Sequence, residues 1–351
     1  MFITGLGTAA PASCFSQKEC WEVFSKSPIC EQLEPRSRAI VRKVLTSDNG
    51  IATRRLALDR IEEAFELSPD LLHSRFLRHA PALATQAASR ALEDAGIAPG
   101  QIDAVIVSTC TGYLCPGLSS YVTQRMGLRA NILALDLVGQ GCGAALPNLR
   151  TGEALLRAGR CERILSICVE VCSAALYFDN DPGVLVSACL FGDGAGAAVL
   201  ANEPNPRRVI RWVNSTSFLE PKDRDLLRFE QRTGMLRNIL TPQVPEVASR
   251  RAAALFDQLI GQCETARENI CGWVLHPGGR DVVLALRKTL GLTEHDTRWS
   301  EQVLRDFGNV SSSSVFFVLE SAFADSAIPG TWFMSSFGAG FSCHGALLEI
   351  G

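Results

Sequence analysis

The sequence predicts an α/β fold in which two similar halves follow one another along the chain. Short apolar runs alternate with helical segments in both halves, the pattern of a sheet covered by helices. Two glycine-rich phrases, FGDGAGAAVL at 191–200 and FGAGFSCHGALL at 337–348, each lead into the last strand of a half. This repetition indicates an internal duplication. We place the boundary in the Pro-containing segment 203–206, so that the halves span residues 1–203 and 204–351.

Strands and helices are expected to alternate along the first half. Runs of branched apolar residues predict strands, and Leu or Ala at helical spacing predicts helices. The strands are placed at 2–8, 102–108, 132–137, 163–171 and 197–201. The helices are placed at 19–26, 83–93, 119–126 and 143–158. The short apolar run 132–137 predicts a buried strand, with a glycine-rich turn directly after it.

The same pattern returns in the second half. Strands are expected at 272–275, 331–335 and 345–350, and helices at 252–264, 281–290 and 315–323. A turn of small residues at 308–314 precedes the helix at 315–323, in the place that 139–145 has in the first half. Asn309 is therefore the expected counterpart of Cys142 in the second half.

Bulk composition excludes several classes of protein. With 351 residues, 47% of them hydrophobic, the chain is long enough for a large packed core. A net charge of −3 provides no general attraction to nucleic acid. We expect no secretory signal and no membrane span, because the N-terminus has no charged region ahead of an apolar one and no apolar run approaches about 18 residues.

The thirteen cysteines do not form a metal-binding pattern. There is no CxxC pair and no Cys/His cluster at zinc spacing, so a metal site is not expected. Abundant cysteines without a disulfide framework suit a reducing compartment. We therefore expect a cytoplasmic protein.

Cys142 lies between a predicted strand and a predicted helix, among Gly139, Gly141 and Gly143. A thiol at a helix N-terminus is close to the positive end of the helix dipole, which can lower its pKa to roughly 3.5–7.5. Unpaired backbone N–H groups at the same place can bind a thioester carbonyl oxygen. Cys142 is thus a candidate nucleophile, although a small buried cysteine in a turn is the commoner case.

His276 and Arg54 are further candidates with structural alternatives. His276 ends a predicted strand, and Pro277 biases it toward an extended backbone that directs the ring out of the strand end. Sites gather at such strand ends, but a single histidine is more often structural. Arg54, beside Arg55 in a turn-rich segment, can bind phosphate or simply be solvated.

Three motifs resemble the active-site motifs of the type III polyketide synthases, the chalcone and stilbene synthase superfamily. They are GQGCGAAL at 139–146, LHPGGRDVV at 275–283 and GNVSSSSVFFVLE at 308–320. Their order agrees with that family. Further similarity lies in GTAAPASC near the N-terminus, TGYLCPG at 111–117 and SSFGAGFSCHGALLEI at 335–350, so the resemblance extends over nearly the whole chain.

The resemblance implies a thiolase-like fold, layered αβαβα, in a homodimer. It implies that Cys142 is acylated by a starter acyl-CoA and that His276 and Asn309 are its partners. Malonyl-CoA then loses carbon dioxide, and the carbanion extends the chain on Cys142 over repeated rounds before the product cyclises. Acyl-CoA and malonyl-CoA are thus expected as substrates, with no cofactor.

The resemblance also identifies residues that contact the growing chain. Phe191 matches a phenylalanine between the site and the CoA tunnel, and Ser311 matches a serine near the nucleophile. Cys115 precedes Pro116 where plant enzymes often have a methionine that reaches across the dimer interface. Threonines of the plant cavity align with Cys172 and Ala175, and a second gating phenylalanine aligns with Asn238.

These departures, together with the loss of a proline from the plant GFGPG loop at 336–340, favour a non-plant starter. The smaller, less aromatic lining suggests room for a fatty acyl chain, as in bacterial alkylpyrone or alkylresorcinol synthases. A pyrone or resorcinol-type product is then expected.

Two other functions stay open at this stage. A β-ketoacyl-carrier-protein synthase III shares the fold and the three residues, but has a His-Gln-Ala-Asn type of motif where this chain has His-Pro-Gly-Gly. A non-catalytic thiolase-fold scaffold or a thiol-based redox sensor is the alternative from another class. The complete set of three residues argues against a scaffold, and the missing CxxC pair argues against a sensor.

Overall fold

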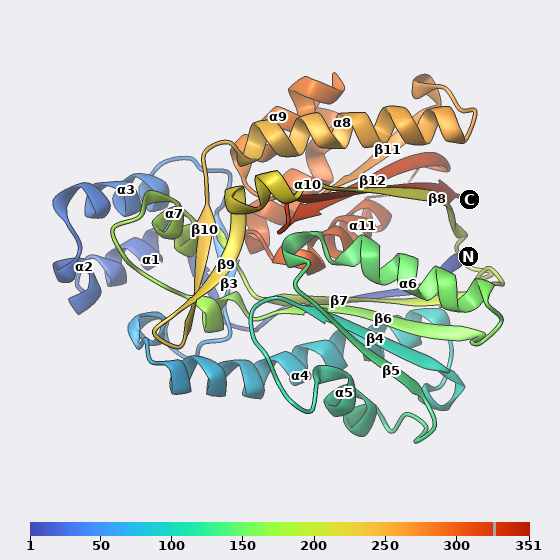
Figure 1. Ribbon diagram of the computed structural model, residues 1–351, viewed down its shortest axis with the longest axis horizontal. Helices are drawn as coiled ribbons and strands as arrows, with labels where there is room; N and C mark the ends of the chain where they lie inside the picture. The colour runs from blue at the N-terminus through green and yellow to red at the C-terminus, as the bar shows by residue number, and fades with distance from the viewer. Residues whose placement is uncertain (326–327) are drawn as a thin grey trace.

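Layers of helices and layers of strands alternate through the molecule (Figure 1). The structure is a computed structural model and describes residues 1–325 and 328–351. The outer helices are α8 (Val244–Gln262) and α9 (Arg280–Leu290) on one side, and α4 (Pro69–Ala95) and α5 (Leu118–Met126) on the other. Between the two strand layers lie α6 (Ala145–Arg157) and α11 (Ser314–Ala324). The predicted thiolase-like αβαβα arrangement is confirmed.

Both strand layers belong to one hydrogen-bonded sheet with the order β11-β12-β13-β8-β1-β7-β6-β4-β5. The first half contributes β1 (Phe2–Ala9), β4 (Ala104–Thr109), β5 (Leu133–Val138), β6 (Arg163–Glu170) and β7 (Gly194–Ala201). The second half contributes β8 (Ile210–Leu219), β11 (Ile270–Leu275), β12 (Gly330–Gly338) and β13 (Ser342–Ile350).

The strand order repeats between the halves. In the first half β4 is parallel to β6, and β6-β7-β1 continue antiparallel. In the second half β11 is parallel to β12, and β12-β13-β8 continue antiparallel. The series β4-β6-β7-β1 and β11-β12-β13-β8 therefore have the same topology, as expected of a duplicated fold.

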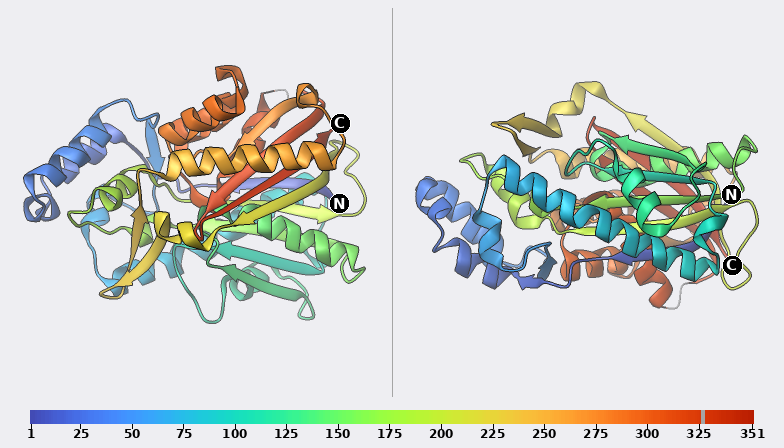
Figure 2. Two further views of the ribbon diagram at one scale, coloured as in Figure 1. Left: turned by 45° about the horizontal axis from the view of Figure 1, so that its top comes forward. Right: turned by 90° about the horizontal axis from the view of Figure 1, so that it is seen from below.

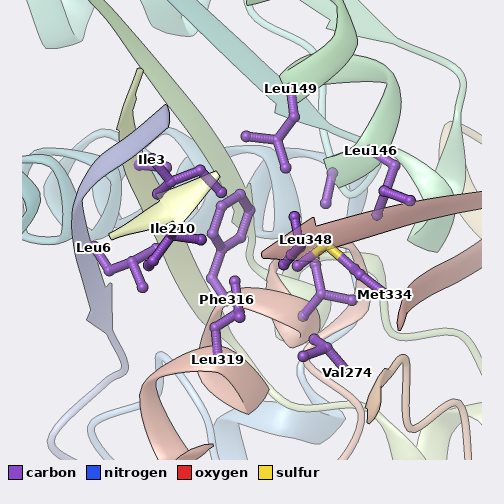
Figure 3. Close-up of a cluster of buried hydrophobic side chains, with 14 of the residues drawn as sticks. Ile3, Leu6, Leu146, Leu149, Ile210, Val274, Phe316, Leu319, Met334 and Leu348 are labelled. Atoms are coloured by element: carbon purple, nitrogen blue, oxygen red, sulfur yellow. The ribbon is translucent and has the colours of Figure 1, made fainter. Parts of the chain in front are cut away.

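Side chains of both halves meet in the central layer. Figure 3 shows Leu146 and Leu149 of α6 approaching the same core as Phe316 and Leu319 of α11, and all four are fully buried. Each such side chain contributes about 1.5–3 kcal/mol through its removal from water. Because this core fixes α6 against α11, it also fixes the turns that precede the two helices.

The remaining elements lie mostly at the end of the molecule opposite the two termini (Figures 1 and 2). The helices are α1 (Gln17–Phe24), α2 (Pro28–Gln32), α3 (Pro35–Thr46), α7 (Pro182–Leu190) and α10 (Glu294–Phe307). Two small hairpins are formed by β2 (Cys14–Ser16) with β3 (Thr53–Arg55) and by β9 (Leu227–Arg232) with β10 (Met235–Leu240). Single 3-10 turns are η1 (Ile61–Phe65), η2 (Pro99–Gln101), η3 (Gly141–Gly143), η4 (Cys172–Ala175), η5 (Pro221–Leu226), η6 (Arg267–Asn269) and η7 (Ser311–Ser313).

The sequence-based strands agree with the structure to within a few residues, but the burial expected for 132–137 is wrong. This segment is β5, an edge strand that pairs only with β4 among the described residues, and most of its side chains are exposed. Leu133 is 40% and Val138 57% exposed. An apolar run is compatible with a buried strand, but only the sheet order decides whether it has neighbours on both sides.

Several helices differ from the expectation. The helix placed at 252–264 is α8, which starts at Val244, and α2, α3 and α10 were not predicted. The helix placed at 83–93 is α4, which already starts at Pro69 behind the N-cap Ser68 and continues through Pro81. Helix α7 was not predicted, so the glycine phrase at 191–200 follows a helix and not a strand. Within the described residues no helix combines the length and apolarity needed to cross a membrane.

Candidate active site

Cys142 lies on η3, the short turn between β5 and α6. Gly139 and Gly141 have φ values of +84° and +57°, in the left-handed region that glycine adopts without steric strain. The turn places the thiol in the interior, where the residue is 8% exposed. Gly338 of β12 packs against this turn so closely that a Cβ there would lie 3.1 Å from the Cys142 amide nitrogen.

His276 follows the last residue of β11 and is 1% exposed. Its ring packs edge-on against Phe337, with 4.9 Å between the ring centroids. Neither ring nitrogen has a hydrogen-bond partner among the described residues. Buried polar atoms are normally paired, so two unpartnered nitrogens indicate a place that a substrate group occupies.

Asn309 connects the other two residues. Its Nδ2 donates to the carbonyl oxygen of Gly278 at 3.1 Å, two residues after His276. Its Oδ1 accepts from the Ser311 amide at 2.9 Å. Ser311 Oγ in turn donates to Cys142 Sγ at 3.3 Å. The structure thus brings together the three residues that the sequence singles out.

Ser311 has an unusual backbone, with φ of +52°. A non-glycine residue in this region is disfavoured by about 1–3 kcal/mol, and such residues concentrate at functional sites. The conformation directs the hydroxyl toward Cys142 and also places it 3.6 Å from Cys110 Sγ. Ser311 is therefore held as the polar neighbour of the nucleophile.

Burial reverses the pKa expected for the thiol. Removal from water raises the pKa of Cys142 to about 12, and the Glu170 carboxylate also raises it, against smaller opposite effects of the Ser311 hydroxyl and the residue's own amide. Burial thus acts against the lowering expected at a helix N-terminus, because a buried thiolate loses its solvation. Burial also lowers the pKa of His276 to about 3. Burial thus favours the neutral form of the Cys142 thiol and of the His276 imidazole, each taken separately.

Cys110 and Glu170 were not identified from the sequence. Glu170 is fully buried at the end of β6 and accepts hydrogen bonds from Thr111 Oγ1 at 2.8 Å, from the Cys110 amide at 3.1 Å and from Cys110 Sγ at 3.3 Å. Burial raises the pKa of this carboxyl. The available signal was one acidic residue inside the apolar run 163–171, since such a residue must be paired.

A cavity next to Ser311 is lined by most of the residues predicted to contact the growing chain. They are Phe191, Ser311, Cys172, Ala175 and Asn238. Leu176, Ala188 and Phe229 contribute apolar surface, and Thr111, Tyr177 and Ser187 complete the lining. The cavity has a volume of about 20 Å³, which is room for one water molecule. This cavity by itself has no room for a fatty acyl chain.

Two predicted residues lie elsewhere. Arg54 is 5% exposed and donates to the carbonyl oxygens of Ala188 and Phe191, so the expected phosphate-binding or solvated role is wrong. A turn-rich sequence cannot show that the Arg54 side chain is buried against the end of α7. Cys115 is exposed on the loop before α5 and does not line the cavity of its own chain.

A larger groove of about 910 Å³ begins at Arg280, directly after the His276–Gly279 segment. It runs between α9, α10 and the loop at 48–52. Arginines and carboxylates alternate along it: Arg280, Arg287, Arg298 and Arg305, with Asp48, Glu294, Glu301 and Asp325. No cluster of His, Cys, Asp and Glu suited to a metal ion occurs in the described part of the chain.

Comparisons with known proteins identify the family of the chain. Residues 16–213 match the model of FAE1/Type III polyketide synthase-like proteins, and residues 216–346 match the C-terminal domain of chalcone and stilbene synthases. The chain is 30% identical to a 3,5-dihydroxyphenylacetyl-CoA synthase of Streptomyces toyocaensis, over 99% of this chain and 89% of that protein. It is also 30% identical to a 1,3,6,8-tetrahydroxynaphthalene synthase of Streptomyces peucetius subsp. caesius, over 99% and 92%.

A solved structure gives the same result. The crystal structure of PKS-I from the brown alga Ectocarpus siliculosus superposes with a TM-score of 0.89 at 25% identity, over 99% of this chain and 97% of that one. These matches set aside the carrier-protein synthase and the non-catalytic scaffold. The chain belongs to the type III polyketide synthase family and is an acyltransferase of that family.

Proposed function

We propose that this protein condenses malonyl-CoA repeatedly, with loss of carbon dioxide, onto an acyl group held on Cys142. The observation that carries the proposal is the buried set of Cys142, His276 and Asn309, in which both nitrogens of His276 lack a partner among the described residues. Asn309 and a neutral His276 both donate hydrogen bonds. Their chemistry suits a thioester oxygen that becomes an enolate.

The first step loads the starter. His276 takes the Cys142 proton, and the thiolate attacks the carbonyl carbon of the acyl-CoA. The carbon–sulfur bond to CoA then breaks, and CoA leaves as a thiol with the proton from His276. The separate pKa values of about 12 and about 3 disfavour either charge alone in the buried site. Formed together, the thiolate and the imidazolium attract one another, which offsets part of the cost of burying each charge. We infer that the proton moves from Cys142 to His276 when the acyl-CoA binds.

The second step extends the chain. The thioester oxygen of malonyl-CoA accepts hydrogen bonds from His276 and from Asn309 Nδ2. The bond to the carboxylate breaks, carbon dioxide leaves, and the electron pair forms the enolate. Its carbon attacks the Cys142 thioester, and Cys142 leaves as thiolate. The low pKa of His276 suits this step, because a neutral imidazole donates a hydrogen bond without first requiring a buried charge.

Each step uses only protein groups and the two CoA substrates, so we infer that no cofactor takes part. In the groove at Arg280, Arg287 pairs with Glu294 and Glu301 and Arg298 pairs with Asp325, so these guanidinium groups are not free to bind the CoA phosphates. The product of the repeated cycle cyclises to a pyrone or resorcinol-type ring. The small cavity favours a short starter, and a fatty acyl chain requires the apolar lining to move.

The edge strand β5 supports a homodimer. Its backbone groups on one side are unpaired within the described residues, and Tyr113, Leu133 and Val138 nearby are 71%, 40% and 57% exposed. Exposed strand edges with apolar side chains pair with a second chain. Cys115 on the adjacent exposed loop is then the residue that reaches the partner's cavity.

Two expectations of organisation and location complete the proposal. A boundary between residues 203 and 204 falls in the connection between β7, which ends at Ala201, and β8, which begins at Ile210. A cytoplasmic location suits the thirteen cysteines, all of which are free thiols.

The test is an incubation with malonyl-CoA and a series of acyl-CoA starters from acetyl to palmitoyl, analysed by mass spectrometry. We expect triketide or tetraketide products with the native protein and none with Cys142→Ala. Extended products from Cys142→Ala, or their absence with every starter in the native protein, would refute the proposal. The preferred chain length reports how far the cavity opens.

A further inference from the structure

Arg54 is a buried cation without a carboxylate in hydrogen-bond contact among the described residues. Its Nη1 donates to the carbonyl oxygens of Ala188 at 2.8 Å and Phe191 at 3.1 Å. Its Nη2 lies 3.3 Å from Cys20 Sγ. The two carbonyls belong to the last turn and the C-cap of α7, where helix carbonyls have no partner within the helix. Arg54 therefore caps α7 from the side of β3 and opposes the negative end of the helix dipole.

The end of α7 in turn holds the backbone of Asn309. The backbone N–H of Asn309 donates to the Leu190 carbonyl oxygen at 2.9 Å, and the backbone N–H of Gly192 donates to the backbone carbonyl oxygen of Asn309 at 3.0 Å. Phe191 and Asn309 thus form a parallel bridge. The two residues that bond to Asn309, Leu190 and Gly192, directly flank Phe191, whose carbonyl oxygen accepts from Arg54.

Gly308 adds a direct contact between Arg54 and this segment. A Cβ at Gly308 would lie 3.1 Å from Arg54 Cγ and 2.7 Å from the Leu190 carbonyl oxygen. The arginine stem is therefore packed against the residue that precedes Asn309. Arg54 meets the Asn309 segment both through α7 and by contact, while its hydrogen bonds go to neither Cys142 nor His276.

We propose that Arg54 is a positioning residue. By holding the backbone of Asn309, it fixes the position of the Asn309 side-chain amide and thereby the rate of malonyl-CoA decarboxylation. The inference rests on the proposed function, in which Asn309 Nδ2 donates to the developing enolate. Loading of the starter depends on Cys142 and His276, and the link reaches Cys142 only indirectly, through the Ser311 amide that donates to Asn309 Oδ1, so loading is expected to fall less than decarboxylation. Loss of Arg54 therefore separates the two half-reactions, which a general loss of folding does not do.

The experiment measures the half-reactions separately in the full-length protein. Loading is followed as acetyl transfer from acetyl-CoA to Cys142, by intact-protein mass spectrometry. Decarboxylation is followed as conversion of malonyl-CoA to acetyl-CoA in the Cys142→Ala background, where no acyl group can be loaded. Arg54→Met removes both carbonyl contacts, and Arg54→Lys keeps the charge but cannot reach both carbonyls with one planar group.

Arg55→Met is the matched control. Arg55 is the next residue of β3, and its side chain donates to the Ala12 carbonyl at 3.0 Å, away from α7. We expect Arg54→Met to reduce kcat for decarboxylation about 10- to 100-fold with little change in KM, because small misplacements of a catalytic donor have effects of this size. Arg54→Lys should be intermediate. Loading should fall by less than about threefold in both, because Arg54 reaches Cys142 only through Asn309 and Ser311, and Arg55→Met should change neither reaction.

Equal losses in loading and decarboxylation, or no loss in either, would overturn the inference. Circular dichroism and thermal melting show whether Arg54→Met folds. If it does not, the inference is tested with Arg54→Lys, by comparing its loss in decarboxylation rate with its loss in loading rate. Native protein that neither loads nor decarboxylates contradicts the proposed function instead, so the two failures are distinguishable.

Discussion

Ser311 Oγ and Cys142 Sγ lie 3.3 Å apart although the residues are 169 positions apart in the sequence. They come from equivalent turns of the two halves, η7 before α11 and η3 before α6. The core between α6 and α11 holds these turns together. The candidate active site thus combines the two halves, with the proposed nucleophile Cys142 from one and Ser311 and Asn309 from the other.

Replacement of Ser311 by Ala should make Cys142 less reactive. The Ser311 hydroxyl lowers the pKa of Cys142 against the larger effect of burial, so its loss raises that pKa further. We expect alkylation by iodoacetamide at pH 8 to slow about 3- to 10-fold. Ser313→Ala is the control, because Ser313 Oγ donates to the Val310 carbonyl and not to the thiol. Equal rates in native protein and Ser311→Ala would show that the contact has no influence on the thiol.

Replacements of the three central residues should separate loading from decarboxylation. Cys142→Ala should abolish chain extension and still decarboxylate malonyl-CoA, because His276 and Asn309 remain. Asn309→Ala should reduce decarboxylation about 10²- to 10³-fold, as expected for loss of one donor to a developing oxyanion. Acetyl-CoA release from malonyl-CoA is the measurement. Unchanged release by Asn309→Ala would exclude the role proposed for its amide.

Acid should destabilise the fold through His276. Its folded pKa of about 3 lies below the unfolded value of 6.5, so the unfolded state binds more protons between these pH values and stability is lost as pH falls through them. The full contribution is present above about pH 6.5. His344, with a pKa lowered by burial to about 4, acts in the same direction.

We therefore expect His276→Gln to reduce the slope of unfolding free energy against pH by about 1.4 kcal/mol per unit between pH 6 and 4.5. Urea unfolding at several pH values gives this slope. His295→Gln, at a position near the start of α10 and outside the core, should leave it unchanged. Identical slopes in His276→Gln and native protein would mean that the buried imidazole does not dominate the acid response.

Truncation of the central core should be costly. Leu149 of α6 is fully buried among residues of both halves, so Leu149→Ala should lower the free energy of unfolding by about 2–5 kcal/mol. Leu284 of α9 is 45% exposed, and Leu284→Ala should change it by no more than about 0.5 kcal/mol. Chemical denaturation measures both. A small effect at Leu149 would imply that the two halves are not held together by this layer.

The dimer predicted at β5 can be tested with a charge. Leu133→Arg places a guanidinium on the exposed edge strand, where it would be buried between two chains. We expect sedimentation analysis to give a dimer for the native protein and a monomer for Leu133→Arg. Leu284→Arg on α9 serves as the control and should remain dimeric. A native protein that sediments as a monomer contradicts the proposal directly.

Local patterns in the sequence were sufficient for the fold class and most strands, and they singled out Cys142, His276 and Asn309, whose catalytic roles stay a prediction. Strand positions such as 163–171 follow from continuous apolar runs, and the turns around Cys142 and Asn309 follow from small residues before an apolar helix. Apolar runs and small-residue turns depend only on residues that are neighbours in the sequence, so each can be recognised from a single segment of the chain. The family was recognisable from the order of three such motifs.

Only the tertiary structure decided what surrounds each of these residues. Apolar run 132–137 became an exposed edge, Arg54 became a buried cap on α7, and the unremarked Glu170 became a neighbour of Cys142. Burial, which depends on distant segments, raises the pKa of Cys142, whereas the local position at a helix start predicts a lower pKa. Sheet order, burial and desolvation arise from contacts between residues far apart in the chain, and no local pattern contains them.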